Sequence, residues 1–138
     1  MPSDLPTGAF GVYSTCMADS TPTAAGDPDC FFCAIASGAA GVPLVVDADG
    51  VVAFRDINPQ APTHVLVIPK RHYRDVPDLA AAEPEVLAEL VAVGKQIADG
   101  EAGGEFRLVF NTGPGAGQSV FHVHGHVLGG RSFTWPPG

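Results

Sequence analysis

Three histidines alternate near the C-terminal end of the chain, where His122, His124 and His126 are each separated by one residue. Side chains of a β-strand point alternately to its two faces, so this spacing predicts that the three imidazoles share one surface. Two kinds of chemistry use such a row. Neutral imidazoles are zinc ligands, and in phosphoryl or nucleotidyl transfer one imidazole attacks phosphorus while its neighbours donate hydrogen bonds.

The segment before these histidines favours the second chemistry. It contains Gly113, Gly115 and Gly117, whose backbone N–H groups are free to converge on an anion, and it is longer than a tight hairpin needs. Gln118 and Ser119 add side-chain donors where the loop enters the histidine strand. An anion site beside a histidine nucleophile predicts attack on a phosphate.

The pattern of apolar residues, glycines and prolines predicts the elements that position these groups. A short helix over residues 30–38 follows Asp27 and Asp29, either of which could cap it. One long helix between residues 78 and 100, with Pro84 in its first turn, has apolar side chains at steps of three and four. Five strands are predicted at residues 43–46, 51–55, 63–70, 106–111 and 119–128. This order indicates an α+β fold, an antiparallel sheet with one long and one short helix.

Composition limits the class of protein. The 138 residues are 46% hydrophobic and 16% charged, which is typical of one packed domain and excludes a disordered or fibrous chain. The net charge of −8 excludes a nonspecific coat for a nucleic-acid polymer. With neither an 18-residue apolar run nor a secretory signal, we expect a cytoplasmic protein that does not bind membranes. Residues 1–29 are predicted to be a flexible or surface-draped extension, and residues 30–138 the domain.

Two cysteines form a second candidate site. Cys30 and Cys33 have the Cys-x-x-Cys spacing of metal or redox chemistry, while the third cysteine, Cys16, lies in the extension. The alternative is that both are small buried residues of the short helix.

Longer motifs now indicate a family. His122-Val-His124-Gly-His126-Val matches the alternating signature of the histidine triad (HIT) family. Three further segments resemble its Hint branch, the nucleoside phosphoramidate hydrolases: RDINPQAPTHVLVIPKRH, NTGPGAGQSVFHVH and LGGRSFTWPPG. The resemblance covers about residues 30–138, and the terminal Trp-Pro-Pro-Gly is more specific than the triad. It implies a HIT-like five-stranded sheet that continues as a ten-stranded sheet across a homodimer.

The resemblance also implies residue roles. His124 would be the nucleophile that forms a covalent nucleotidyl-histidine, with its Nδ1 proton held by the backbone carbonyl of His122. His126 and His122 flank it, His64 supports the triad, and Ser119 lies near the phosphate and leaving group. Asp56 would accept the ribose hydroxyls, and Trp135 would reach the partner's site. The full set implied to bind nucleotide is Phe31, Phe32, Ile35, Asp56, Ile57, Leu66, Asn111, Gly117, Gln118, Ser119 and Trp135.

A structural zinc ion is the second implication. Some HIT proteins and the related galactose-1-phosphate uridylyltransferases bind zinc through residues that here correspond to Cys30, Cys33, His72 and His122. No cofactor is implied for catalysis. One departure from the family concerns Gly125, which replaces a bulky apolar residue on the face opposite the histidines and leaves the packing there open.

The expected activity is hydrolysis of the P–N bond of purine nucleoside phosphoramidates to AMP or GMP, without a catalytic metal. Three alternatives stay open. One is a dinucleoside polyphosphate hydrolase or nucleotidyl transferase of the same superfamily, against which the Trp-Pro-Pro-Gly terminus argues. The others are a nucleotide-binding interaction module and a zinc-stabilised scaffold.

Overall fold

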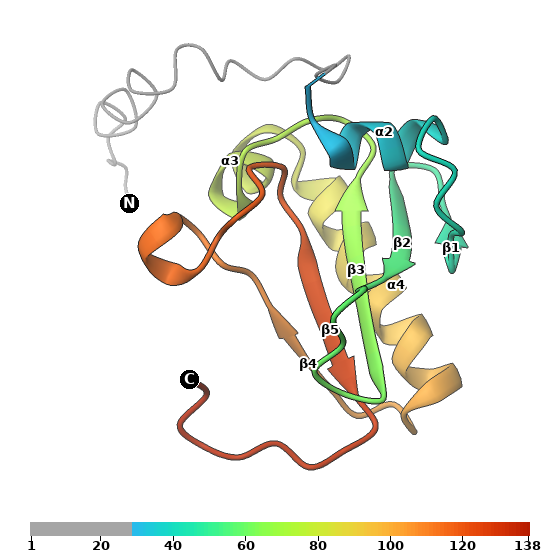
Figure 1. Cartoon of the computed structure of the whole chain (residues 1–138), viewed down its shortest axis with the longest axis vertical. Coiled ribbons are helices and arrows are strands. Elements are labelled where there is room, and N and C mark those ends of the chain that lie inside the picture. The colour runs from blue at the N-terminus through green and yellow to red at the C-terminus, as the bar shows by residue number, and fades with distance from the viewer. Residues whose placement is uncertain (1–28) are drawn as a thin grey trace.

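The computed structural model describes residues 29–138, in which a five-stranded antiparallel sheet has helices on both faces (Figure 1). The strand order is β1-β2-β3-β5-β4, which confirms the predicted α+β fold. The strands are β1 (Val46–Asp47), β2 (Val51–Arg55), β3 (Thr63–Pro69), β4 (Phe106–Val109) and β5 (Gly125–Gly129). The helices are α2 (Phe31–Ser37), α3 (Val76–Ala82) and α4 (Pro84–Glu101), and η2 (Pro114–Ala116) is a 3-10 turn.

The central strands β2 and β3 are buried along almost their whole length because both faces of the sheet are covered. On one face α3 and α4 pack against the sheet through buried aliphatic side chains: Val51, Ala53, Val65, Val67, Leu79, Leu90, Val93, Ile97 and Val127. On the other face the short helix α2 covers a second cluster: Phe32, Ile35, Val52, Phe54, Leu66 and Ile68. This second face also carries the histidines.

Helix α2 begins and ends for identifiable reasons. Its N-cap is Cys30, whose Sγ accepts from the backbone N–H of Cys33 at 3.4 Å, so the expected cap by Asp27 or Asp29 is wrong for Asp29 and Asp27 lies outside the described residues. It ends at Gly38, as predicted, where a φ of 88° favours glycine.

The long helix predicted between residues 78 and 100, with Pro84 in its first turn, corresponds to α4, and a separate helix, α3, precedes it and was not predicted. α3 ends at Ala82 and α4 begins at Pro84, with Glu83 between them outside helical geometry. Proline has no N–H to donate and is favoured in the first turn, so it starts the second helix instead of continuing the first. The side chain of Glu83 accepts a hydrogen bond of 2.8 Å from the Tyr73 hydroxyl.

The histidine strand is shorter than predicted, because β5 begins only at Gly125, not at residue 119. The ladder between β3 and β5 ends at the Val67–Gly125 pair. Beyond it the carbonyl of Pro69 is 2.9 Å from a ring nitrogen of His122, and the N–H of Val123 donates to the loop residue Tyr73 at 2.8 Å. Side-chain and loop contacts therefore replace the expected strand pairing. The strands predicted at 43–46 and 106–111 are also shorter, as β1 spans Val46–Asp47 and β4 ends at Val109.

The side chains behind the histidine segment leave no room for a bulky residue at Gly125. A Cβ atom at this position would lie 3.1 Å from the nearest side-chain carbon of each of Leu90, Leu108 and Phe110. These side chains fill the space that a bulky residue would occupy, so the back of the strand is closely packed.

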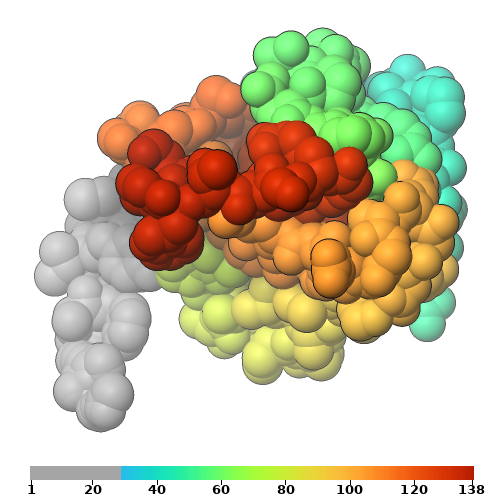
Figure 2. Space-filling model, turned by 90° about the horizontal axis from the view of Figure 1, so that it is seen from below, coloured from blue at the N-terminus to red at the C-terminus, as the bar shows by residue number. Residues whose placement is uncertain are grey.

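The C-terminal segment runs across one end of the molecule, where Figure 2 shows it in red between the green segment near residue 60 and the orange segment near residue 100. Arg131 Nε donates to the Gln60 carbonyl at 3.0 Å, and its guanidinium lies 4.2 Å from the centre of the Phe133 ring. Trp135 is 81% exposed on this segment.

Two further predictions concern membrane-spanning helices and the N-terminal extension. No helix within residues 29–138 is long and apolar enough to cross a bilayer. The extension predicted over residues 1–29 lies, apart from Asp29, outside the described residues.

Candidate active site and metal centre

His124 is held so that one ring nitrogen is free to react. Its Nδ1 lies 2.9 Å from the backbone carbonyl of His122, and a carbonyl only accepts, so Nδ1 carries the proton. Nε2 of the neutral ring therefore keeps its lone pair. Phe32 packs its ring edge against the imidazole at a centroid distance of 5.2 Å, which restricts the ring to this orientation.

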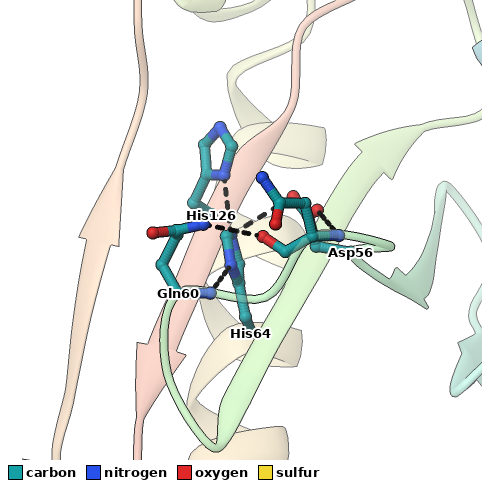
Figure 3. Close-up of polar contacts among 5 residues, drawn as sticks. Asp56, Gln60, His64 and His126 are labelled. Carbon is teal, nitrogen blue, oxygen red and sulfur yellow. Dashed lines mark hydrogen bonds and ion pairs between the residues drawn. The ribbon is translucent and has the colours of Figure 1, made fainter.

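A chain of hydrogen bonds sets the tautomer of the next histidine (Figure 3). The backbone N–H of Gln60 donates to Nδ1 of His64 at 3.0 Å, so a neutral His64 carries its proton on Nε2. This Nε2 atom lies 3.0 Å from Nδ1 of His126 and 3.4 Å from a carboxylate oxygen of Asp56. His126 must then accept at Nδ1 and carry its own proton on Nε2.

The Nε2 atom of His126 has no partner among residues 29–138, although it is buried. A buried N–H without a hydrogen bond costs about 1–3 kcal/mol, so such groups are rare unless a ligand completes them. Its ring lies 5.0 Å from that of His124, centre to centre. The site thus presents a nucleophilic lone pair beside an unsatisfied donor.

Burial favours the neutral forms of His64 and His126. It lowers the pKa of His126 to about 4, with further lowering by His124 and His64, against the opposing charge of Asp56. The pKa of His64 is also lowered by burial, and Asp56 again opposes the shift. Neutral imidazoles are what the tautomer assignments above require.

These groups line one end of a cavity of about 460 Å³. Its polar end is formed by Asp56, Ser119, His124 and His126. The rest of the wall is mainly apolar and comprises Phe31, Phe32, Ile35, Val42, Phe54, Arg55, Ile57, Leu66 and Val120. Phe31 and Ile57 are 63% and 99% exposed, so they stand at its mouth. The cavity can hold a flat apolar group beside the histidines.

The glycine loop is organised differently from the sequence-based expectation. Gly113 N–H donates to Oε1 of Gln118 at 2.8 Å, and Gly117 N–H donates to the Pro114 carbonyl at 3.1 Å. These two groups therefore do not converge on an anion, and that prediction is wrong for them. The Gln118 amide also donates to the carbonyls of Arg74, at 2.8 Å, and Val120, at 3.1 Å, so it fixes the loop shape from a position only 4% exposed.

The predicted nucleotide residues divide into two groups. Seven of them line the cavity: Phe31, Phe32, Ile35, Asp56, Ile57, Leu66 and Ser119. Asn111, Gly117, Gln118 and Trp135 do not line it. The first three belong to the adjoining loop region, whereas Trp135 lies on the C-terminal segment.

Sequence reasoning missed some site residues. Phe54 could be found only from the strand register, because β2 pairs Phe54 with Leu66 of β3, and directly opposed side chains share a face of the sheet. Gln60 acts through its backbone N–H, and no side-chain pattern reports such a role.

The cysteines and two histidines meet at the other end of the histidine row. Nδ1 of His122 lies 3.5 Å from Sγ of Cys30 and 3.4 Å from Sγ of Cys33, and Nδ1 of His72 lies 3.3 Å from Sγ of Cys33. A tetrahedral zinc ion holds neighbouring sulfur and nitrogen ligands about 3.6 Å apart. His122 directs its other nitrogen, Nε2, to the Pro69 carbonyl, which leaves the Nδ1 lone pair for a metal. The four residues fit zinc.

A second group with three ligand atoms close together does not fit. Asp56, His64 and His126 offer one atom each within 4.8 Å of one another. The Gln60 N–H places the proton of neutral His64 on Nε2, the atom that would face the metal. This cluster is therefore a hydrogen-bonded relay, not a metal site.

Comparisons with known proteins identify the family to which the chain is similar. The family model of the HIT domain matches residues 41–133. The chain is 50% identical to a HIT-like protein of Synechocystis sp. over 69% of this chain and 84% of that protein. It is 49% identical to a 14 kDa zinc-binding protein of Zea mays and 46% identical to the adenylylsulfatase HINT1 of Arabidopsis thaliana, over 69% of this chain and 77% and 67% of theirs.

Solved structures show the same likeness. A HIT family hydrolase from Legionella pneumophila matches with a TM-score of 0.73 and 46% identity, over 80% of this chain and 100% of that one. A zinc-bound histidine triad protein from Mycobacterium smegmatis matches with a TM-score of 0.67 and 34% identity, over 82% of each chain.

Proposed function

The chain belongs to the HIT family, and we propose that it is a Hint-type hydrolase that cleaves the P–N bond of purine nucleoside phosphoramidates to release AMP or GMP. The observation that carries the proposal is the state of His124. Its Nδ1 proton is bound to the His122 carbonyl, so Nε2 offers a lone pair at the polar end of an apolar cavity.

The reaction follows from the positions of the groups. Nε2 of His124 attacks the α-phosphorus, a new N–P bond forms, and the bond from phosphorus to the amine breaks with its electron pair on the amine. The amine leaves with a proton taken from solvent, which the attacking water of the second step returns. Water then attacks the phosphorus of the nucleotidyl-histidine, which releases the nucleoside monophosphate and restores His124.

His126 supports the first step through its free N–H. Its Nε2–H, oriented by His64 and Gln60, is a donor for a phosphate oxygen or for the departing amine, on which negative charge develops. A donor that is already oriented needs no reorganisation during the reaction. Substrate also satisfies a buried group that is otherwise unpaired.

The remaining cavity suits the nucleoside. Asp56 stands beside the histidines, where its carboxylate can accept the ribose hydroxyls. The cavity wall also contains Phe32, Phe54, Leu66 and aliphatic side chains, which would contact a purine through its faces. A mainly apolar wall distinguishes adenine from guanine weakly, so we expect both to bind.

We propose a structural zinc ion at Cys30, Cys33, His72 and His122, with no metal in the reaction. When bound, zinc supplies a cross-link between the loop after β3, α2 and the histidine segment. The donor distances support this assignment, as does similarity to zinc-binding relatives. Cysteine thiols stay reduced in the cytoplasm, the location expected for this protein, so the two sulfurs would be available to a metal there.

We also propose a homodimer, as the family resemblance implies. Strand β4 is at an edge of the sheet and Trp135 is 81% exposed, so both are accessible to a second copy. Sedimentation equilibrium tests this directly: the mass of one chain would contradict the proposal.

The activity is tested by phosphorus NMR of adenosine 5′-phosphoramidate with the wild type and His124→Ala. We expect AMP only with the wild type and a rate loss of about 10⁴-fold or more in the variant, which should still bind AMP. The same samples receive adenylyl sulfate and a dinucleoside polyphosphate. If the wild type cleaves one of those and leaves the phosphoramidate intact, P–N hydrolysis is wrong.

A further inference from the structure

We propose that the four metal ligands act as positioning residues for the active site, so that zinc and nucleotide bind cooperatively although they do not touch. The inference extends the proposed function, since it takes the cavity beside His124 as the nucleotide site. None of Cys30, Cys33, His72 and His122 lines that cavity. Any effect of the metal on nucleotide must therefore pass through the protein.

The first connection is the backbone of His122. This residue faces the cysteine sulfurs with Nδ1, and its Nε2 donates to the Pro69 carbonyl. Its own carbonyl accepts the Nδ1 proton of His124. A metal bond at Nδ1 restrains the residue whose carbonyl sets the tautomer of the nucleophile. With zinc bound, the proton of His124 should stay on Nδ1, so that the Nε2 lone pair is free to attack phosphorus.

The second connection is the first turn of α2. Phe32 lies between Cys30 and Cys33 in the sequence. Its ring contacts the His124 imidazole at a centroid distance of 5.2 Å and an interplanar angle of 85°. Helix α2 has only seven residues, and a helix this short depends on tertiary contacts for its stability. Two thiolate bonds to the metal anchor the end of the helix from which Phe31, Phe32 and Ile35 form part of the pocket wall.

Both connections lead to the same groups, the nucleophile and the apolar wall. Zinc should therefore favour the conformation that binds nucleotide. Because linkage is reciprocal, nucleotide should raise the affinity for zinc by the same factor. A zinc ion that only stabilised the fold would leave nucleotide affinity unchanged in any folded sample.

The test uses His72→Ala, which removes one ligand and leaves the cavity lining intact. AMP affinity is measured by calorimetry over a series of zinc concentrations, with circular dichroism of each sample to confirm folding. We expect the dissociation constant of AMP to be about tenfold higher at low zinc and to recover as zinc fills the weakened site. His72→Cys, which keeps four ligands, should recover at lower zinc, and the neighbouring Arg71→Ala should behave as the wild type.

Two further measurements separate this inference from the proposed function. Nitrogen NMR of the imidazoles without nucleotide should show His124 as the Nδ1–H tautomer with zinc and as a mixture of tautomers without it. Zinc release from the wild type to excess chelator should slow in saturating AMP, by about tenfold when the whole gain in zinc affinity lies in the dissociation rate. The release experiment needs no folded metal-free protein, so it also covers variants that unfold.

The outcomes are distinct. AMP affinity that is independent of zinc, with an unchanged His124 tautomer and unchanged zinc release, overturns the coupling while leaving the proposed hydrolase intact. A zinc-dependent His124 tautomer in a protein that does not bind AMP contradicts the proposed function but retains the positioning role of the ligands.

Discussion

Replacing Gly125 with leucine should destabilise the protein. This glycine lies between His124 and His126 in the chain, and its backbone is against a closely packed layer of side chains. A Cβ atom there would be 3.1 Å from a carbon of each of Leu90, Leu108 and Phe110. Carbon atoms attract best at about 3.5–4.0 Å, so even this first atom requires its neighbours to move. Leucine adds three more carbons with no space to enter. Overpacking of this kind costs about 1–3 kcal/mol.

A second substitution should restore much of the loss. Phe110→Val removes as many side-chain carbons as Gly125→Leu adds, so the double variant conserves the volume of this layer. Alone, Phe110→Val should cost about 1–3 kcal/mol, because the removed ring leaves a cavity against the core. Together the two changes should cost at least about 1 kcal/mol less than the sum of the single variants, which is a coupling expected only between residues in contact.

Urea unfolding measures these free energies, with saturating zinc and a fixed protein concentration so that ligand binding and association do not differ between samples. The control combines Gly125→Leu with Leu44→Ala, which packs in the cluster on the opposite face of the sheet and should add independently. If the Gly125→Leu/Phe110→Val pair is as additive as the control, Phe110 does not fill the space at Gly125 and the packing argument fails.

Three further predictions concern the site. His64→Ala should lower kcat about 10- to 100-fold with little change in AMP affinity, because the proton of His126 is no longer held on Nε2; equal losses in both quantities would contradict the relay. The unfolding free energy should fall as pH drops from 6.5 toward about 4, because the unfolded chain binds a proton before His126 does in the folded state. His126→Gln should make the unfolding free energy less dependent on pH in this range, by the equivalent of up to about one bound proton. An unchanged dependence on pH would refute the assignment to His126. Gln118→Leu should speed hydrogen exchange at residues 113–117, since it leaves the Gly113 N–H and the Arg74 carbonyl without their partner; unaltered exchange would show that the amide does not hold the loop.

The elements with strong local signals were predictable. β2 was predicted with the residues it has, and α2 ends at Gly38, where only a positive φ completes the turn. The start of α4 at Pro84 agrees with the prediction of this proline in a first turn, whereas α3 was not predicted, because its seven residues are too few to show an apolar period. The Cys-x-x-Cys spacing identified a candidate metal site, but the orientation of four donors toward one point is a property of the folded loops.

The histidine row shows why alternation alone could not assign roles. It predicted one surface formed by one strand, yet only His126 lies in β5. The strand ladder ends before His122, since the Pro69 carbonyl is engaged by the His122 ring and the next backbone donor turns to Tyr73. The first histidine is thereby directed to the cysteines, while the second and third face the cavity. Which nitrogen of each ring carries the proton then depends on three backbone groups: the Pro69 carbonyl, the His122 carbonyl and the Gln60 N–H. Every sequence has such groups at nearly every position. Side-chain patterns can therefore locate a site of this kind, whereas its proton arrangement follows only from the backbone that surrounds it.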